Sequence, residues 1–403
     1  MAVSSVFAQL PKRVAAYNYM NSGEFDKAKE AIDEASAHPK TIVDYKTWYY
    51  KGTIYLNIAM NKNFQSFDAD ASQKSLEAYS KTLTLNFKDI QYQNLDILNK
   101  KEDFQKFKTL QNDKTVRFTD DIAYEDIMTE KFTMLLNVIV EKGVIEYEAK
   151  NYSKALDFFE KAIFITDITD KKNLLVYYNA ALASEKSNSF ENADKYYDEL
   201  IKGEYGATNI EKSGMYKLAA EVKLAQKDTI EYVQLLKQGI NKYPNECSVI
   251  LTELINFYLN KKEINTALNY LKLAIEKEPK NQTYYFAQGS LFENANKPDS
   301  AEISYKKALE IEPNNFEFNY YTGVLYFNNA ASFINSANEQ KDDSKYNELK
   351  KKSELEFVKA QPYLEKALEL NAKDINTMQS LKTLYYRLGL TEKYDAMDAK
   401  LKQ

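Results

Sequence analysis

The side chains that most often carry chemistry are scarce in this sequence. It holds one histidine, His38, and one cysteine, Cys247, among 403 residues. A metal site needs several ligands, so a lone histidine without a neighbouring Cys or His predicts no metal centre. No glycine-rich phosphate loop, nucleophile elbow or HExxH motif is present. Cys247 has no convincing histidine partner and is expected to be a structural thiol near the start of a helix.

Carboxylates, by contrast, are in good supply. The 59 acidic residues offer many acid–base pairs, but the sequence gives no distances between them. A catalytic helical protein is therefore one hypothesis. Because no motif fixes such a pair, we expect no catalytic residues and no cofactor, and a protein that is not an enzyme.

The composition favours helices and an ordered core. With 10 glycines and 7 prolines, the turn residues of an all-β protein are missing, while 44% of residues are hydrophobic. The 54 basic and 59 acidic residues are mixed along the chain and give a net charge of -5. No basic stripe is available to neutralise phosphates, so we expect no nucleic-acid partner. No apolar run approaches the roughly 20 residues of a membrane-spanning helix, and no transmembrane segment is predicted.

The first residues resemble the end of a secretion signal. In "MAVSSVFAQ", an apolar stretch ends at Val6, Phe7 and Ala8, and Gln9 follows. This pattern suits a signal-peptidase site after Ala8, although the basic leader and most of the apolar segment are absent. We interpret residues 1–8 as the remnant of a signal peptide and expect a periplasmic or cell-envelope protein. The alternative is an ordinary frayed terminus and a cytoplasmic protein.

A repeated pattern predicts the fold. The stretch from Gln282 to Asn315 carries seven landmarks: Tyr285, Gly289, Phe292, Ala301, Tyr305, Ala308 and Pro313. The first three share one helix face, and the next three share a face of a second helix. Small residues let the two helices cross closely, aromatic residues fill the space beside the crossing, and the proline ends the second helix. The unit is a helix–turn–helix.

The same pattern recurs along the chain. Moved back by 34 residues, the frame reads Leu251, Ile255, Tyr258, Ala267, Leu271, Ala274 and Pro279. Near the N-terminus, the first half of the pattern recurs as Trp48, Gly52 and Tyr55. These landmarks resemble the tetratricopeptide repeat (TPR). The resemblance covers about nine-tenths of the chain. It implies an all-α TPR-type helix-turn-helix solenoid, a right-handed superhelix with a concave binding surface.

The frame also divides the chain. We expect N-terminal TPR units with an insertion in 9–87, a degenerate unit or connecting helices in 88–135, five TPR units in 136–315, a unit with a long hairpin insertion in 316–374, and C-terminal capping helices in 375–403. In the long insertion, Gly323 and Ala360 are 37 residues apart, against 12 between Gly289 and Ala301. Both helices are expected to lengthen into a hairpin that protrudes by roughly 15–20 Å. A smaller version, with 11 extra residues, is expected after Gly52. Such insertions and the Asn/Tyr/Lys-rich composition make the chain similar to exported TPR proteins of Bacteroidota.

The resemblance implies which residues face the groove. In the family, the concave face comes mainly from the second, fifth, ninth, twelfth and thirteenth positions of each first helix. The aromatic residues at such positions are Tyr17, Tyr49, Tyr147, Tyr178, Phe286, Tyr320 and Phe327. The asparagines are Asn21, Asn57, Asn260, Asn294 and Asn328 at the thirteenth position and Asn256 at a ninth. Asparagine could hold the backbone of an extended peptide, or it could simply suit a helix end. Most other tyrosines are expected to fill the core.

These positions predict a neutral, aromatic groove. TPR proteins that clamp a C-terminal carboxylate combine a basic residue with asparagine, and no unit here supplies both; Arg13, for example, is followed by Tyr17 at the ninth position. A co-chaperone of that kind is disfavoured. We expect a scaffold that mediates protein–protein interaction with a protein or peptide partner. The alternative is an exported glycan-binding protein that stacks sugars on the aromatic groove.

Overall fold

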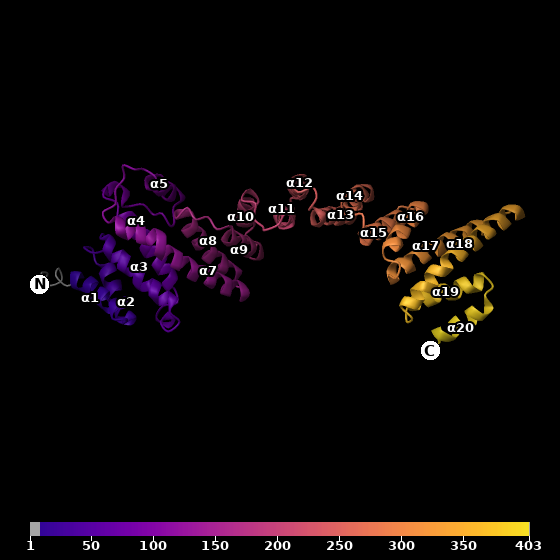
Figure 1. The fold of residues 1–403 in the computed structure, drawn as a ribbon, viewed down its shortest axis with the longest axis horizontal. Helices are drawn as coiled ribbons and strands as arrows, with labels where there is room; N and C mark the ends of the chain where they lie inside the picture. The colour runs from indigo at the N-terminus through magenta and orange to yellow at the C-terminus, as the bar shows by residue number, and fades with distance from the viewer. Residues whose placement is uncertain (1–8, 403) are drawn as a thin grey trace. The chain divides into compact units, whose positions relative to one another are not determined.

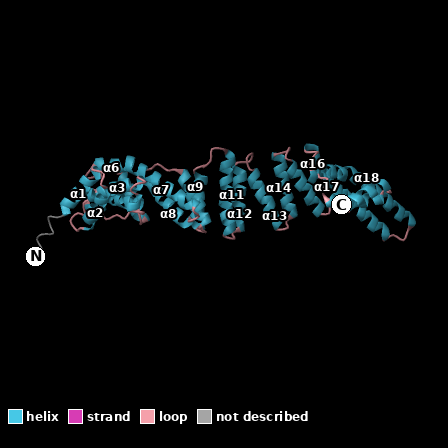
Figure 2. Cartoon of the chain, turned by 90° about the horizontal axis from the view of Figure 1, so that it is seen from below, coloured by secondary structure: helices cyan, strands magenta, loops and turns pink. Residues whose placement is uncertain are grey.

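The computed structural model describes residues 9–402; residues 1–8, interpreted above as a signal-peptide remnant, and residue 403 lie outside the described residues. Helices dominate this range, which contains no strand and a single isolated bridge between Phe87 and Phe118 (Figures 1 and 2). The fold is all-α and of the TPR type, as predicted. No helix in 9–402 is both long and apolar enough to cross a membrane.

The chain forms two compact units. Of the described residues, the N-terminal unit contains 9–207 and 221–228, and the C-terminal unit contains 208–220 and 229–402. The helices of the N-terminal unit are α1 (Gln9–Asn21), α2 (Phe25–Ala37), α3 (Tyr45–Met60), η1 (Gln65–Phe67), α4 (Ala71–Leu85), η2 (Ile90–Tyr92), α5 (Lys101–Gln111), α6 (Asp121–Asp126), η3 (Ile127–Lys131), α7 (Phe132–Glu148), α8 (Tyr152–Ile168), α9 (Leu174–Lys186) and α10 (Phe190–Lys202). Helix α11 (Asn209–Ala225) contributes residues to both units. Those of the C-terminal unit are α12 (Thr229–Lys242), α13 (Ser248–Asn260), α14 (Ile264–Lys277), α15 (Gln282–Asn294), α16 (Pro298–Ile311), α17 (Phe316–Asn338), α18 (Asp343–Leu370), α19 (Ile375–Arg387) and α20 (Thr391–Leu401).

One turn conformation joins the two helices of most repeats. The fifteenth residue of the 34-residue frame has a positive φ in seven repeats: Gly23, Lys150, Asn188, Lys227, Lys262, Asn296 and Gly389. A left-handed residue ends a helix and turns the chain, and only glycine adopts it without a steric cost. The recurrence of this turn at Gly389 places α19 and α20 in the same frame as the preceding repeats.

Glycine at the eighth position brings the paired helices together. A Cβ added at Gly52 would lie 2.6 Å from Tyr79 Cε1, and one added at Gly143 would lie 2.6 Å from Phe159 Cε1. Gly289 faces Tyr305 in the same way, and Gly323 faces Leu364. Four crossings therefore depend on the missing side chain, because each leaves room for a large residue of the partner helix.

The long insertion is a helical hairpin. Helices α17 and α18 contain 23 and 28 residues and pack side by side (Figure 1). Small residues are buried along the pair, with Ala330 and Ala337 on α17 and Ser353 and Ala360 on α18. Close approach of the two helices therefore continues beyond the length of an ordinary repeat.

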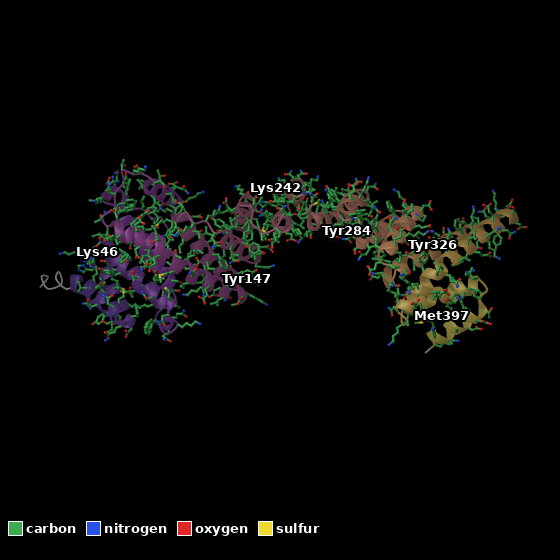
Figure 3. All side chains as sticks on the ribbon, viewed as in Figure 1. Lys46, Tyr147, Lys242, Tyr284, Tyr326 and Met397 are labelled. Carbon is green, nitrogen blue, oxygen red and sulfur yellow. The ribbon has the colours of Figure 1, made fainter. Side chains whose placement is uncertain are left out.

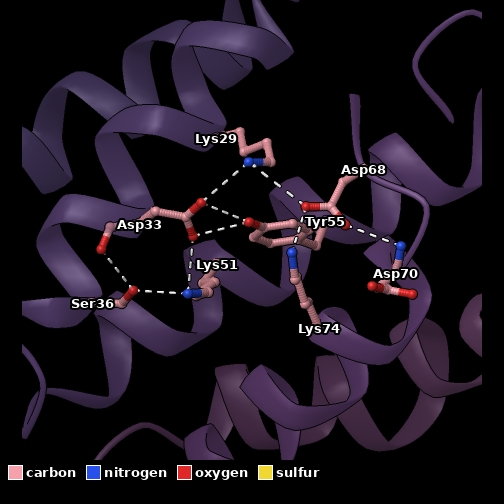
Figure 4. Close-up of polar contacts among 8 residues, drawn as sticks. All are labelled: Lys29, Asp33, Ser36, Lys51, Tyr55, Asp68, Asp70 and Lys74. Atoms are coloured by element: carbon pink, nitrogen blue, oxygen red, sulfur yellow. Dashed lines mark hydrogen bonds and ion pairs between the residues drawn. The ribbon is translucent and has the colours of Figure 1, made fainter. Parts of the chain in front are cut away.

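The short insertion differs from the expected hairpin. The chain between α3 and α4 is a loop with only the 3₁₀ turn η1. The Asn61 and Asp68 side chains each accept a backbone N–H bond from the residue two positions on, at 3.0 Å. Such local bonds compete with helix formation. Asp68 also pairs with Lys74 at 2.6 Å, which ties the loop to α4 (Figure 4).

The segment expected to be degenerate contains α5 and the start of a long helical run. Helices α6 and α7 are continuous through the π-helical turn η3, so the first helix of the repeat assigned to 136–169 already begins at Asp121. Helix α5 packs on α8, with the Phe104 and Phe164 ring centroids 5.6 Å apart. The Lys108 ammonium donates to the Ile168 carbonyl oxygen at 3.2 Å. This segment therefore covers part of α8 instead of continuing the stack.

Candidate functional site

The two predicted groove aromatics on α1 and α3 have different surroundings. The Tyr17 side chain is 40% exposed, and its ring centroid lies 5.1 Å from that of Tyr50. Tyr49 is half-buried, and its hydroxyl donates to Asp126 Oδ2 at 2.6 Å. Burial raises the pKa of the Tyr49 hydroxyl, which stays protonated. Tyr17 is available to a ligand, whereas Tyr49 is engaged by a residue of α6.

The next two predicted aromatics also have internal partners. Tyr147, marked in Figure 3, is half-buried and lies edge-on to Tyr152, with ring centroids 5.2 Å apart. Tyr178 stacks on Tyr205 at the same separation. Each ring has lost part of the surface that a ligand could contact.

In the C-terminal unit, the predicted aromatics contribute to packing. The Phe286 ring centroid lies 4.9 Å from that of Phe318, and the side chain packs against a buried cluster that includes Tyr305. Tyr320 stacks on Phe316 at 5.9 Å. Phe327 lies edge-on to Phe357 at 5.3 Å and packs against the core shared by α17 and α18. All three are half-buried between helices.

The predicted asparagines are mostly exposed. Asn21, Asn256, Asn260, Asn294 and Asn328 have exposed side chains, whereas Asn57 is half-buried. Its Nδ2 donates to the Thr53 carbonyl oxygen at 2.8 Å, one turn back along α3. Helices α1, α13 and α15 end at Asn21, Asn260 and Asn294, which agrees with a preference for helix ends. Only Asn57 and Asn328 of the thirteenth-position set lie inside helices.

Exposed aliphatic residues also occupy predicted groove positions of the repeat frame. Val144 is 37% exposed at a ninth position, and Leu175 and Val249 are 51% and 44% exposed at second positions. They are not among the residues predicted above, which are all aromatic residues or asparagines. The repeat numbering could have identified them, because each is an aliphatic residue at a position of the frame that is expected to face solvent.

The histidine and the cysteine have local structural roles. His38 Nδ1 accepts the Lys40 backbone N–H at 3.3 Å in the turn after α2. Cys247 is buried and its thiol donates to the Pro244 carbonyl oxygen at 3.4 Å. Burial raises the pKa of the Cys247 thiol, which makes the reactive thiolate rare. Among the residues that the structure describes, no group of three or more His, Cys, Asp or Glu could hold a metal ion.

Comparisons with known proteins agree with the repeat frame. The family model for the tetratricopeptide repeat matches residues 282–315. Human protein O-mannosyl-transferase TMTC3 is 23% identical over 216 residues, 51% of this chain and 24% of that protein, so the chain spans about a quarter of this relative. Among solved structures, a TPR-repeats protein from Bacteroides fragilis is 22% identical, with 62% of this chain and 98% of that chain covered and a TM-score of 0.32. The C-terminal part of a TPR repeat-containing protein from Cytophaga hutchinsonii is 16% identical, with 65% and 93% covered and a TM-score of 0.43.

The identification rests on the matched repeat and its continuation. The helix pair α15–α16 fills the matched residues, and the same turn and the same glycine crossing recur in both units. The chain is a tetratricopeptide-repeat protein.

Proposed function

We propose that the protein is a non-catalytic scaffold that binds a segment of a partner protein on the first helices of its repeats, in the periplasm or cell envelope. The observation that carries this proposal is the exposure of Tyr17, Val144 and Leu175 at groove positions of the N-terminal unit. Exposed apolar side chains that recur on one face of a repeat protein are typical of an interaction surface.

The chemistry of these positions favours a peptide over a glycan. Sugars are held by stacking on aromatic rings, and most of the groove aromatics are already packed against neighbours. Aliphatic residues such as Val144 and Leu175 complement the apolar side chains of a peptide instead. A glycan ligand is therefore the second outcome to be tested and not a second proposal.

The test is a double substitution in the N-terminal unit. V144S/L175S removes apolar contact area from exposed positions and should leave the fold intact. We expect the affinity for a partner captured from envelope extract to fall at least about tenfold. The matched control is I122S, because Ile122 is 82% exposed on α6 and lies outside the groove positions.

Two results would contradict the proposal. One is equal release of the partner by V144S/L175S and I122S at unchanged melting temperature. The other is a glycan-array signal that the double substitution abolishes, with no protein partner recovered from either envelope or cytosolic extract.

A further inference from the structure

The helix pair α19–α20 (Figure 1) departs from the repeat frame where its two helices cross. In each preceding pair, the residue that corresponds to Tyr305 of the matched repeat is apolar and buried. These residues are Ile32, Tyr79, Phe159, Tyr197, Leu236, Leu271, Tyr305 and Leu364. In α20 the corresponding residue is Asp398, which is half-buried. A charged residue therefore replaces the apolar side chain that fills the other crossings.

Large side chains also replace the small residues that let paired helices approach each other. The matched repeat has Gly289, Ala301 and Ala308 at its crossing, and the corresponding residues of α19 and α20 are Lys382, Tyr394 and Leu401. Larger side chains at a crossing hold the helix axes farther apart. An open pocket of about 970 Å³ lies at this crossing, with Lys382 and Leu401 in its lining.

The pocket combines apolar and basic side chains. The apolar ones are Met378, which is buried, Leu401, which is half-buried, and Ile375, which is 58% exposed. The ionisable ones are Lys373, Lys382 and Lys400. Among the described residues that line the pocket, none is acidic. The lining therefore complements a ligand that carries negative charge beside an apolar surface.

The carboxylates next to the pocket are already engaged. Asp398 accepts from the Lys382 ammonium and from Lys402 Nζ, the latter at 2.6 Å. These two hydrogen bonds lower the pKa of the Asp398 carboxyl to about 2. Asp374 precedes α19, and its Oδ1 accepts from the Thr377 backbone N–H at 2.7 Å, which caps the helix. Neither carboxylate pairs with the other two lysines of the lining.

Those two lysines lack a carboxylate partner. Lys373 and Lys400 are exposed, and neither forms an ion pair with a residue in 9–402. One precedes α19 and the other lies in the last turn of α20, so each helix of the pair contributes one ammonium group. A single exposed ion pair adds little affinity, but two of them select a partner by its charge while burial of apolar surface stabilises the complex.

The preceding helix pair shows which element such a face accepts. Helix α19 packs on α17 and α18, and its Leu381 and Leu384 are buried in a core with Phe357 and Leu364. An amphipathic helix is therefore the element that covers a helix pair of this fold. Helix α1 of a second copy carries two basic residues and no acidic one, so it does not supply the charge that this pocket complements.

We propose that the α19–α20 pocket binds an acidic amphipathic helix of a partner protein. The apolar face of that helix covers Ile375, Met378 and Leu401, and its glutamate or aspartate side chains pair with Lys373 and Lys400. The pocket belongs to the C-terminal unit, whereas the exposed positions that carry the proposed scaffold function belong to the N-terminal unit.

The binding experiment uses the full chain and three fluorescein-labelled peptides of about 18 residues, a length that can form a helix. The peptides share one leucine face and carry glutamate, glutamine or lysine at the positions beside it. By fluorescence anisotropy, we expect the glutamate peptide to bind most tightly, the glutamine peptide more weakly and the lysine peptide not measurably. V144S/L175S should leave these affinities unchanged, which separates this proposal from the scaffold function.

Two variants test the two parts of the pocket. K373Q/K400Q should weaken binding of the glutamate peptide about three- to tenfold at low salt and leave binding of the glutamine peptide unchanged. I375S should weaken binding of both peptides, because both use the apolar contact, and should keep the melting temperature because Ile375 is exposed. The matched control is K350Q/K351Q, which removes two exposed lysine charges from α18.

Four results would each overturn the proposal. The lysine peptide could bind as tightly as the glutamate peptide, or none of the three peptides could bind. K350Q/K351Q could lose as much glutamate-peptide binding as K373Q/K400Q, which would show a general effect of charge. In sedimentation velocity, the full chain could self-associate and K373Q/K400Q could abolish this association, which would assign the surface to a second copy.

Discussion

At four helix crossings, a glycine of the first helix faces a large side chain of the second. The pairs Gly143–Phe159 and Gly289–Tyr305 are 16 residues apart, whereas Gly52 and Tyr79 are separated by 27 and Gly323 and Leu364 by 41. The contact persists although insertions of different length lie between its members. What recurs from repeat to repeat is the contact between glycine and a large side chain, and not the number of residues between them.

This contact gives a prediction at residue scale. In G289A, the new Cβ would lie 2.5 Å from Tyr305 Cε1, and Tyr305 is fully buried, so the ring or the two helices must shift. We expect a loss of about 1–3 kcal/mol in the free energy of unfolding, measured by denaturant titration. G214A is the control, because nothing lies within 4 Å of its added Cβ inside α11, and it should gain up to about 1 kcal/mol. A G289A variant as stable as G214A would contradict the claim that the crossing at Gly289 requires glycine.

Residue roles in the groove were harder to predict than the frame. The frame placed Tyr49 and Phe286 on first helices, but it could not show what packs against them. Asp126, which accepts the Tyr49 hydroxyl, belongs to a segment without repeat landmarks. Phe286 reaches Phe318 of the next repeat, a contact that depends on the angle between repeats. The exposed aliphatic positions were predictable in principle, since they follow from the same numbering.

At the scale of elements, the two insertions followed different physics. In the long one, the α18 side is rich in Lys, Glu and Leu, which favour a helix, and small side chains are buried along both helices, so the paired helices extend. The short one carries Asn61, Asn63, Asp68 and Asp70, whose side chains favour turns. The length of each insertion was predictable from the spacing of the landmarks. Whether the insertion forms a loop or a helical hairpin depends on the local side chains.

Helix α18 contains an internal proline whose effect on stability can be measured. Pro362 lies inside the helix, so the Val358 carbonyl loses its usual N–H partner. Both residues are exposed. We expect P362A to restore this bond and to raise the free energy of unfolding by roughly 1–3 kcal/mol. E354A, at another exposed position of α18, is the control and should change stability little. A lower stability in P362A would indicate that the hairpin needs the bend that proline imposes.

At the scale of the whole molecule, the composition predicted the class and the repeats predicted the architecture. Helix-favouring residues, scarce glycine and one 34-residue frame were sufficient for an all-α TPR protein. The packing of α5 on α8 could not be predicted, because α5 belongs to a segment without repeat landmarks. Sequence spacing carries no information about such a contact.

The most direct test of the scaffold proposal is site-specific photo-crosslinking in the native cell. Benzoylphenylalanine is placed at Leu175, an exposed groove position, and in a separate variant at Ile122, an exposed position outside the groove. The account predicts a discrete protein adduct from Leu175 in the envelope fraction and none from Ile122. The absence of any adduct from Leu175, or the same adduct from both positions, would contradict it.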